Sequence, residues 1–342
     1  MQNPKKYQLI FIALILLLIV CFFINISLGS ISIPNKDILK TILGTNDNLS
    51  WHHIIINYRL PKAFTAMIVG SGLGISGLMM QTLFRNPLAG PFVLGITSGA
   101  SLGVAIVTMG ASLFGGVLLG VLASKWTLVM AATLGSFLVL LTVLIVSTKV
   151  RDAMAILIIG LMFGSISAAL VNVLSYFSSA EELQQYFFWG FGSLGNLSWQ
   201  ELLILFVLYA LGILLSLAAI KSLNSLLLGE NYAKSLGLNI KKSRLIIITS
   251  TSLLAGTITA FAGPIAFIGL AIPHITRQVF STSNHRILLP AVFLFGAIIM
   301  LICDSIAQLP TSDYTLPINA ITSLIGAPVV IWLLVRKRKM MF

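Results

Sequence analysis

The chain has 342 residues, of which 58% are hydrophobic and only 9% are charged, whereas a typical soluble domain is about a quarter charged, so the composition excludes a soluble protein. The net charge of +12 would suggest nucleic-acid binding in a soluble chain, but these basic residues lie between apolar segments, where they orient membrane helices. We therefore expect a protein that contacts the lipid bilayer and binds no nucleic acid.

Apolar segments near the roughly 20 residues that cross a bilayer recur along the chain. They are predicted at 8–29, 61–83, 92–123, 127–147, 153–175, 201–220, 245–276, 287–309 and 317–335. The first is kept as a membrane helix, because it does not end in the small-residue cleavage site of a signal peptide. Two segments, 92–123 and 245–276, exceed the usual spanning length, so each is either tilted or internally broken.

The basic residues indicate which side of the membrane each connection occupies. With the N-terminus inside, 16 of the 21 basic residues fall on the inside, as the positive-inside rule requires. The five that remain outside are Lys36, Lys40, Arg59, Lys62 and Lys125.

The same rule resolves the two long segments. Arg85 and Arg151 both lie inside only if 92–123 crosses once, and Arg244 and Arg277 both lie inside only if 245–276 crosses twice. The second segment is therefore predicted to be a hairpin that turns near Gly263 and Pro264. The prediction is an all-α membrane protein with about ten crossing helices and both termini inside, in which residues 1–342 form one domain.

Three Gly-x-x-x-Gly pairs place small residues on one helical face, where two backbones can approach closely. They start at Gly70, Gly116 and Gly160. Packing within the chain is favoured here over a dedicated dimer seam.

No sequence motif indicates catalysis or cofactor binding. No glycine is followed by lysine, so the phosphate-binding loop GxxxxGK[ST] is absent. The two cysteines, Cys21 and Cys303, lie inside apolar runs, and the four histidines have no metal-ligand spacing. We predict no catalytic residue, no directly bound cofactor and no metal site, so any ATP dependence must come from a partner.

The segment 58–103 reads YRLPKAFTAMIVGSGLGISGLMMQTLFRNPLAGPFVLGITSGASLG. It resembles permeases of the FecCD type, whose pattern of RLPR, a glycine-rich helix, Q-x-x-x-RNPLA-x-P and LG-x-x-x-GA is met in the same order. The resemblance continues at 186–199, 226–238, 265–277, 284–290 and 325–334.

This resemblance implies a type II ABC importer permease fold that works as a homodimer, with the pathway between the two copies. The implied substrate is an iron(III)-siderophore, haem or cobalamin. The implied partners are two copies of a cytoplasmic ATP-binding subunit, which would use ATP and Mg, and a periplasmic or lipid-anchored substrate-binding protein. The implied location is the inner membrane of a bacterium.

The largest inside connection, residues 221–244, is named the coupling loop here. In the family this stretch forms short helices that dock in a cleft of the ATPase. Glycines would turn the chain between these helices, and Leu and Ala side chains would contact the partner. The alternative is a basic loop against lipid headgroups. The residues to which the resemblance assigns docking are Leu228, Gly229, Glu230, Ala233, Leu236 and Gly237.

On the outside, Arg59 and Lys62 match positions at which the family meets acidic residues of the binding protein. Complementary charges at a rim mainly favour a fast and correctly oriented encounter. The alternative is that both cations snorkel to lipid headgroups.

On the inside, His274 and Arg277 are expected to brace a turn near the coupling loop rather than to contact the ATPase. The resemblance adds to this set Arg85, Asn86, Pro87 and Arg286.

The sequence departs from the family pattern at the outer corner and at one inside position. Gln308 stands where the family commonly has Arg four residues after Asp304, and residues 315–319 replace ELPxG. A third docking cation is therefore missing, and Asp304 would at best accept a hydrogen bond from Gln308. An intramembrane carboxylate is a functional candidate by default, but its position near the outer boundary favours a structural role. Asn284 replaces the usual Asp, which would weaken pairing with Arg286.

Two other functions fit parts of the sequence. A stand-alone secondary transporter would need ionisable groups near the midplane, and of the nine acidic residues only Asp304 falls clearly within a predicted span. An intramembrane serine protease would use Ser76 in a GxSG motif, with His274 as the candidate base. The residues flanking Ser76 fit the permease pattern, so a helix-packing face is favoured.

Overall fold

The computed structural model describes residues 4–45, 48–110, 124–150, 153–309 and 314–335. Within these ranges the chain is helical and contains no strand. Three sequence expectations lie outside the described residues: the second half of the 92–123 segment, the Gly116 pair, and the inside charges at Arg151 and 336–339.

Most of the predicted spans are single long helices. Among the described residues, seven helices are long and apolar enough to cross a membrane. They comprise α1 (Pro4–Ser27), α4 (Leu60–Leu83), α7 (Lys125–Lys149), α8 (Ala153–Phe177), α10 (Trp199–Ala218), α13 (Ile240–Ala262) and α15 (His285–Ala307). Three shorter helices join them, namely α5 (Ile96–Gly110), α14 (Ile268–Phe280) and α16 (Ile318–Val335). The predicted all-α fold with about ten membrane helices is confirmed.

Short helices form the connections. They are α2 (Asn35–Ile42), α3 (Leu49–Ile54), a π turn (Ile55–Arg59), a 3-10 turn (Pro91–Leu94), α9 (Ala180–Gly190), α11 (Ile220–Leu226) and α12 (Glu230–Ser235). Local sequence fixes several starts. At α10, the Ser198 hydroxyl accepts from the Glu201 N–H, and the Glu201 carboxylate accepts from the Ser198 N–H. This capping box satisfies backbone donors that the first helical turn leaves free.

The predicted hairpin is confirmed at Gly263. Helix α13 ends at Ala262, and Gly263 has φ +77°. A Cβ at this position would lie 2.7 Å from the Trp189 carbonyl oxygen, so both the conformation and the space require glycine. The non-helical segment between α13 and α14 finds a hydrogen-bond partner within the protein, because Asn319 Oδ1 accepts from the Ala266 N–H at 3.0 Å.

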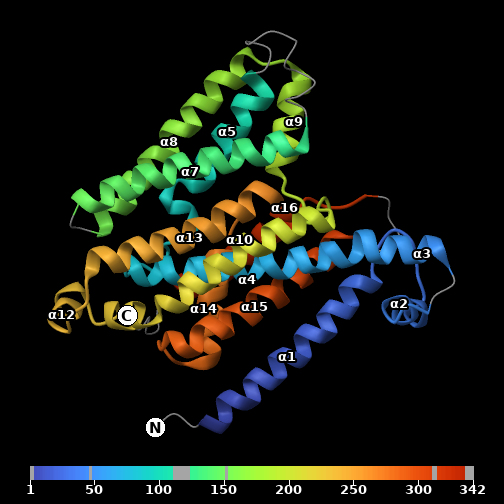
Figure 1. The fold of residues 1–342 in the computed structure, drawn as a ribbon, viewed down its shortest axis with the longest axis horizontal. Helices are drawn as coiled ribbons and strands as arrows, with labels where there is room; N and C mark the ends of the chain where they lie inside the picture. Colours follow the sequence, from blue (N-terminus) through green and yellow to red (C-terminus); the bar gives the residue numbers. More distant parts are fainter. Residues whose placement is uncertain (1–3, 46–47, 111–123, 151–152, 310–313, 336–342) are drawn as a thin grey trace.

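Helix α4 lies at the centre of the molecule, in contact with α10, α13, α14 and α15 (Figure 1). Its glycines permit this crowding. A Cβ at Gly77 would lie 1.6 Å from the Gly269 oxygen of α14, and one at Gly70 would lie 2.1 Å from the Gly296 oxygen of α15. At Gly160 of α8, a Cβ would lie 2.5 Å from a carbonyl oxygen of the 3-10 turn. Both described Gly-x-x-x-Gly pairs therefore pack within the chain.

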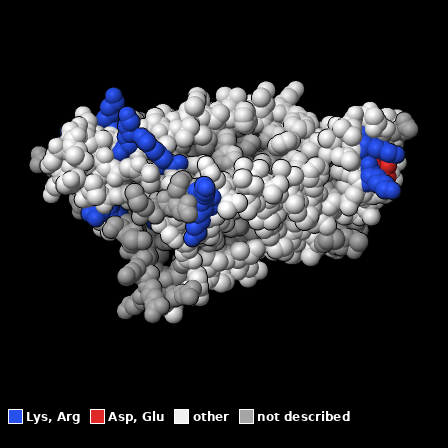
Figure 2. Space-filling model, turned by 90° about the horizontal axis from the view of Figure 1, so that it is seen from below, with Lys and Arg blue, Asp and Glu red and all other residues white. Residues whose placement is uncertain are grey.

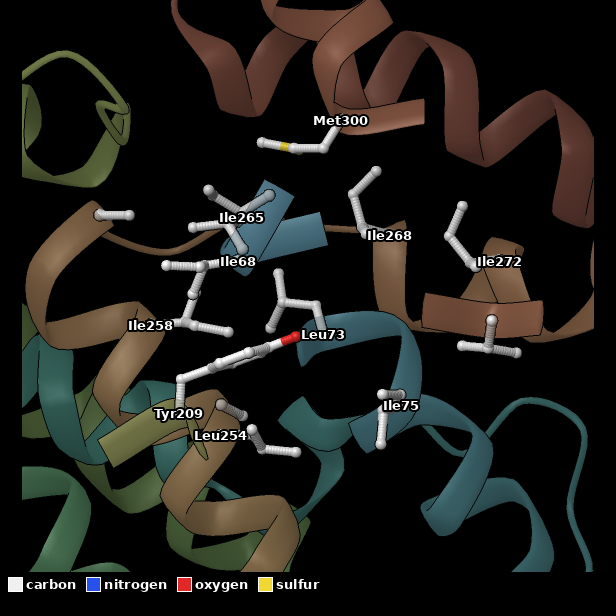
Figure 3. Packing of buried hydrophobic residues seen from close by; sticks show 14 of the residues in the cluster. Ile68, Leu73, Ile75, Tyr209, Leu254, Ile258, Ile265, Ile268, Ile272 and Met300 are labelled. Carbon is white, nitrogen blue, oxygen red and sulfur yellow. The ribbon is translucent and has the colours of Figure 1, made fainter. Parts of the chain in front are cut away.

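The hydrophobic core gathers around α4. Figure 3 shows Ile68 of α4, Ile258 of α13, Tyr209 of α10 and Met300 of α15 converging on one another. The Tyr209 hydroxyl is hydrogen-bonded to Ser71 Oγ at 2.7 Å, so this polar group is satisfied inside the apolar core.

On the face shown in Figure 2, Lys and Arg lie in two groups, one spread from one end of the molecule toward its middle and one at the opposite end, and a broad uncharged band separates the two groups. We name the end that carries α12 the inner end, and the end that carries α2 and α3 the outer end, following the predicted orientation (Figure 1). The outward faces of α1, α7, α8 and α10 are apolar and exposed. An uncharged belt of exposed apolar side chains fits a lipid environment.

Candidate functional site

The coupling loop folds into two short helices at the inner end. Helix α11 ends at Leu226, and the chain turns at Gly229, whose φ is +100°, into α12. A second turn at Gly237, with φ +81°, leads to α13. The glycines thus turn the chain between short helices as expected. Because α13 begins at Ile240, the last part of the predicted loop belongs to a membrane helix.

The coupling loop presents apolar side chains around α12. Leu228 precedes α12, Tyr232 lies within it and Leu236 is its C-cap, and all three side chains are exposed. Ala233, which the sequence assigned to partner contact, is fully buried within the chain, so this expectation needs correction. Ala233 faces the protein while Tyr232, one position earlier and about 100° around the helix, faces outward.

A hollow of about 900 Å³ lies beside Leu228 and Tyr232. Its lining includes Leu228, Tyr232 and Glu230 from the coupling loop, Arg85 from the loop after α4, and Met154 from α8. The exposed face of α12 and the hollow therefore form one continuous surface at the inner end.

Arg244 fixes the coupling loop to the membrane helices. This side chain lies in the second turn of α13 and is almost fully buried. Its Nη2 donates to Glu230 Oε1 of α12, and its Nη1 donates to the Val150 carbonyl at the end of α7 at 3.2 Å. Sequence reasoning missed this role, because Arg244 reads as one more inside cation and its partners are distant in sequence.

The inside turn after α4 contacts α14. His274 Nε2 lies 2.8 Å from the Pro87 carbonyl oxygen, and Arg277 Nη1 donates to Gln81 Oε1 at 3.3 Å. Gln81 Nε2 in turn donates to the Leu270 carbonyl at 3.2 Å. These contacts tie the turn after α4 to α14, the helix that carries His274 and Arg277.

The other predicted members of this set lie differently. Asn86 Oδ1 accepts from the Leu88 N–H and closes the turn on itself. Arg85 is exposed and lies near Gly229 of the coupling loop. Arg286 is exposed, and its backbone N–H donates to Asn284 Oδ1, which caps α15.

At the outer end, Arg59 points into the protein. Its guanidinium donates to the carbonyl oxygens of Ile26 (2.8 Å), Ser27 (3.1 Å) and Ile31, and the residue is only 8% exposed. The expectation that Arg59 is a free docking cation therefore needs correction. Its charge satisfies carbonyls that the end of α1 leaves without helical partners.

Lys62 forms an ion pair with Asp304. The two charged atoms, Nζ and Oδ1, are 3.1 Å apart, and the Lys62 side chain keeps 21% of its surface exposed. Asp304 itself is 2% exposed, and its Oδ2 accepts from Gln308 Nε2 and from Asn25 Nδ2, each at 2.9 Å. The hydrogen bond from Gln308 is confirmed, and the cation beside Asp304 comes from Lys62 on α4 rather than from position 308.

Asn25 is a second residue that sequence reasoning missed. It reaches from α1 to α15, where it contacts Asp304 and also Ser305 Oγ at 3.1 Å. A polar residue within the apolar first helix was the available signal. Together with Lys62 and Gln308, Asp304 lines an outer hollow of about 720 Å³.

The protease hypothesis finds no supporting geometry. Ser76 is fully buried, and its Oγ has no hydrogen-bond partner among the described residues. His274 is hydrogen-bonded to the Pro87 carbonyl instead. Within the described ranges, no group of three His, Cys, Asp or Glu side chains is arranged to hold a metal ion.

Comparison with known proteins places this geometry in context. The FecCD transport family model matches residues 17–336. The hemin transport system permease protein of Yersinia pestis is 34% identical over 328 residues, which cover 95% of each chain. The vitamin B12 import system permease protein of Klebsiella pneumoniae is 37% identical over 339 residues, which cover 99% of this chain and 96% of that protein.

A solved structure is also similar. It is described as an inward-facing conformation of a proposed metal-chelate type ABC transporter. It superposes with a TM-score of 0.82 at 34% identity and covers 98% of this chain and 100% of the other.

Proposed function

Since the chain belongs to the FecCD transport family, we propose that it is the permease subunit of an ATP-binding-cassette importer for a metal chelate. The proposed substrate is an iron(III)-siderophore, with haem and cobalamin as the alternatives. The chain would sit in the inner membrane of a bacterium with both termini in the cytoplasm. It would itself have no catalytic role, because its sequence lacks the phosphate-binding loop.

The observation that carries this proposal is the set of exposed apolar side chains Leu228, Tyr232 and Leu236 in and beside α12 at the inner end. A short helix with exposed apolar side chains in and beside it is suited to insertion into a groove of a partner. The neighbouring hollow of about 900 Å³ leaves room for that partner to surround α12. We propose that a cytoplasmic ATPase subunit covers this surface and uses ATP and Mg.

The remaining partners are proposed from the family and from the outer surface. A substrate-binding protein would dock at the outer end, where Lys62 keeps part of its charge exposed. Two copies of the chain would pair along their membrane helices, and each would bind one ATPase. Exposed apolar side chains such as Ile166 on α8 and Leu324 on α16 are available for a second copy or for lipid.

The ionisable groups argue against a stand-alone secondary transporter. Among the described membrane helices, the acidic side chains are Glu201 and Asp304. Each forms an ion pair, Glu201 with Lys125 at 2.9 Å and Asp304 with Lys62 at 3.1 Å. Acids that are neutralised near the outer end offer little for ion coupling at the midplane.

Reconstitution tests this proposal. The chain is placed in lipid vesicles with its cognate ATPase, its binding protein and internal ATP, and uptake of labelled ferric siderophore, haem and cobalamin is measured. Uptake should require all three proteins and ATP, and the substrate that accumulates identifies the chelate. Uptake by this chain alone, driven by an ion gradient, would contradict the proposal.

A matched pair of variants tests the docking surface. Leu236→Ser removes an exposed apolar side chain at the C-terminal end of α12, whereas Leu49→Ser makes the same change at an exposed position of α3 on the outer end. Co-purification of the ATPase should be weakened by the first change and unaffected by the second. Equal retention of the ATPase by both variants would argue for the alternative, a loop that lies against lipid headgroups.

A further inference from the structure

The coupling loop has a second attachment to the membrane helices, through Asn224 of α11. Asn224 Oδ1 accepts from both the backbone N–H and the ring Nδ1 of His285, each at 2.9 Å. Its Nδ2 donates to Asn284 Oδ1 at 3.1 Å. One side chain of the loop thus makes three hydrogen bonds to the N-cap residue and the first residue of α15.

His285 also contacts α4, so it links α11 to this helix. The residue is 0% exposed, and its Nε2 lies 2.9 Å from Thr82 Oγ1 in the last turn of α4. Because an amide oxygen only accepts, Nδ1 must carry a proton that it donates to Asn224. The three side chains, Asn224, His285 and Thr82, form what we name the inner joint, which links α11, α15 and α4.

The hydrogen bonds of the inner joint constrain α11 in a different way from the apolar contacts around them. Leu223 and Leu226 of α11 are buried, and these contacts hold the helix against the protein. Apolar contacts are non-directional, so they resist separation more than sliding. Hydrogen bonds require a narrow range of distance and angle, so the inner joint fixes the register of α11 against α15 and α4.

A displacement of α11 at the inner joint would be transmitted to α4, the helix at the centre of the molecule. Helix α4 contacts α10, α13, α14 and α15, and its glycines leave no slack against Gly269 and Gly296. Closely packed interiors transmit strain because they are poorly compressible. The end of α4 at Thr82 is therefore suited to convert movement of the coupling loop into movement of the membrane core.

We propose that Asn224 and His285 are positioning residues that couple ATP-driven movement of the coupling loop to substrate movement through the membrane helices. The inference rests on the proposed function and adds to it a specific path, from α11 to α15 and α4. Neither residue would contact substrate or nucleotide. Their loss should separate ATP hydrolysis from transport and leave both partners bound.

The test uses the assembled complex in vesicles and measures substrate transported per ATP hydrolysed. Asn224→Leu keeps the approximate size and removes every hydrogen bond, whereas Asn224→Asp keeps the accepting oxygen for His285. Ser225→Ala is the matched control, since the Ser225 hydroxyl bonds only to the Lys221 carbonyl within α11. The ratio should fall roughly fivefold or more in Asn224→Leu, the lower end of typical coupling energies, and stay near the wild-type value in the other two.

Thr82→Val is the second variant, because it removes the partner of His285 at nearly constant volume and leaves α11 untouched. It should lower the ratio as Asn224→Leu does, so the proposal stays testable if Asn224→Leu does not fold. A transport-to-hydrolysis ratio that stays at the wild-type value in Thr82→Val, or in a folded Asn224→Leu, overturns the inner joint alone. A wild-type complex without ATP-dependent uptake overturns the proposed function and this inference with it.

Discussion

The contact between Gly77 of α4 and Gly269 of α14 gives a sharp prediction for Gly77→Ala. A Cβ at this position would lie 1.6 Å from the Gly269 oxygen, although real Cβ atoms essentially never come closer than 3.0 Å. The difference, 3.0 minus 1.6, is 1.4 Å, and it must be met by backbone movement because the obstructing atom is a carbonyl oxygen. The hydrogen bond from Gln81 to the Leu270 carbonyl, now 3.2 Å long, lies in the same interface and would be stretched.

The expected cost combines three terms. Overpacking costs up to about 3 kcal/mol, and loss of one hydrogen bond costs about 1 kcal/mol. Alanine gains about 1 kcal/mol over glycine in a helix. The net destabilisation is therefore about 3 kcal/mol, which at about 2 °C per kcal/mol for a large chain corresponds to a Tm lowered by about 6 °C.

Thermal unfolding of the detergent-solubilised protein measures this change. Gly190→Ala is the matched control, because a Cβ at the end of α9 would meet no atom within 4 Å. Gly190→Ala should melt at or slightly above the wild-type temperature. Gly77→Ala should melt about 6 °C below the wild type. If it instead melts within about 1 °C of the Gly190→Ala control, the difference is far smaller than the predicted destabilisation, and the packing argument fails.

Four further substitutions, two of them combined in a double variant, test the outer end and the core. Asp304→Ala should destabilise the protein by about 3 kcal/mol because it leaves Lys62 unpaired, and the double variant with Lys62→Ala should recover part of this loss in thermal melts; no recovery would contradict the ion pair. Arg59→Met should cost at least about 2 kcal/mol, since three carbonyl acceptors lose their donor, and a wild-type Tm would refute that role. Ser76→Ala should leave stability within about 0.5 kcal/mol and transport unchanged, whereas a folded, assembled variant without transport would revive a nucleophilic serine.

The membrane fold was predictable because its signals are local and strongly constrained. Chain length per crossing and the placement of basic residues limit each segment independently. This reasoning located the break in 245–276 at Gly263, where the structure has the turn. The family resemblance, together with the conformational freedom of glycine, anticipated that Gly229 and Gly237 would turn the coupling loop.

Pairing between distant residues was not predictable from local patterns. Charge placement predicted the side of the membrane on which Arg59 and Lys62 lie, but it did not predict their partners. The Arg59 guanidinium donates to carbonyl oxygens at the end of α1, and the Lys62 ammonium pairs with Asp304. The partners lie far apart in sequence, and burial alone decides that these charges must be neutralised by other groups of the chain. The same holds for Arg244, whose contact with Glu230 exists only once α12 folds back on α13.

The sequence by itself indicated that this chain crosses a membrane about ten times and that it lacks the GxxxxGK[ST] motif, because each depends on composition or on neighbouring residues. Only the tertiary structure decided which face of α12 is exposed, that Ala233 points inward, and that Asn224 meets His285 and Thr82. These features depend on how helices approach one another in three dimensions. Small residues in a helix permit close approach, but they do not indicate which other helix will pack there.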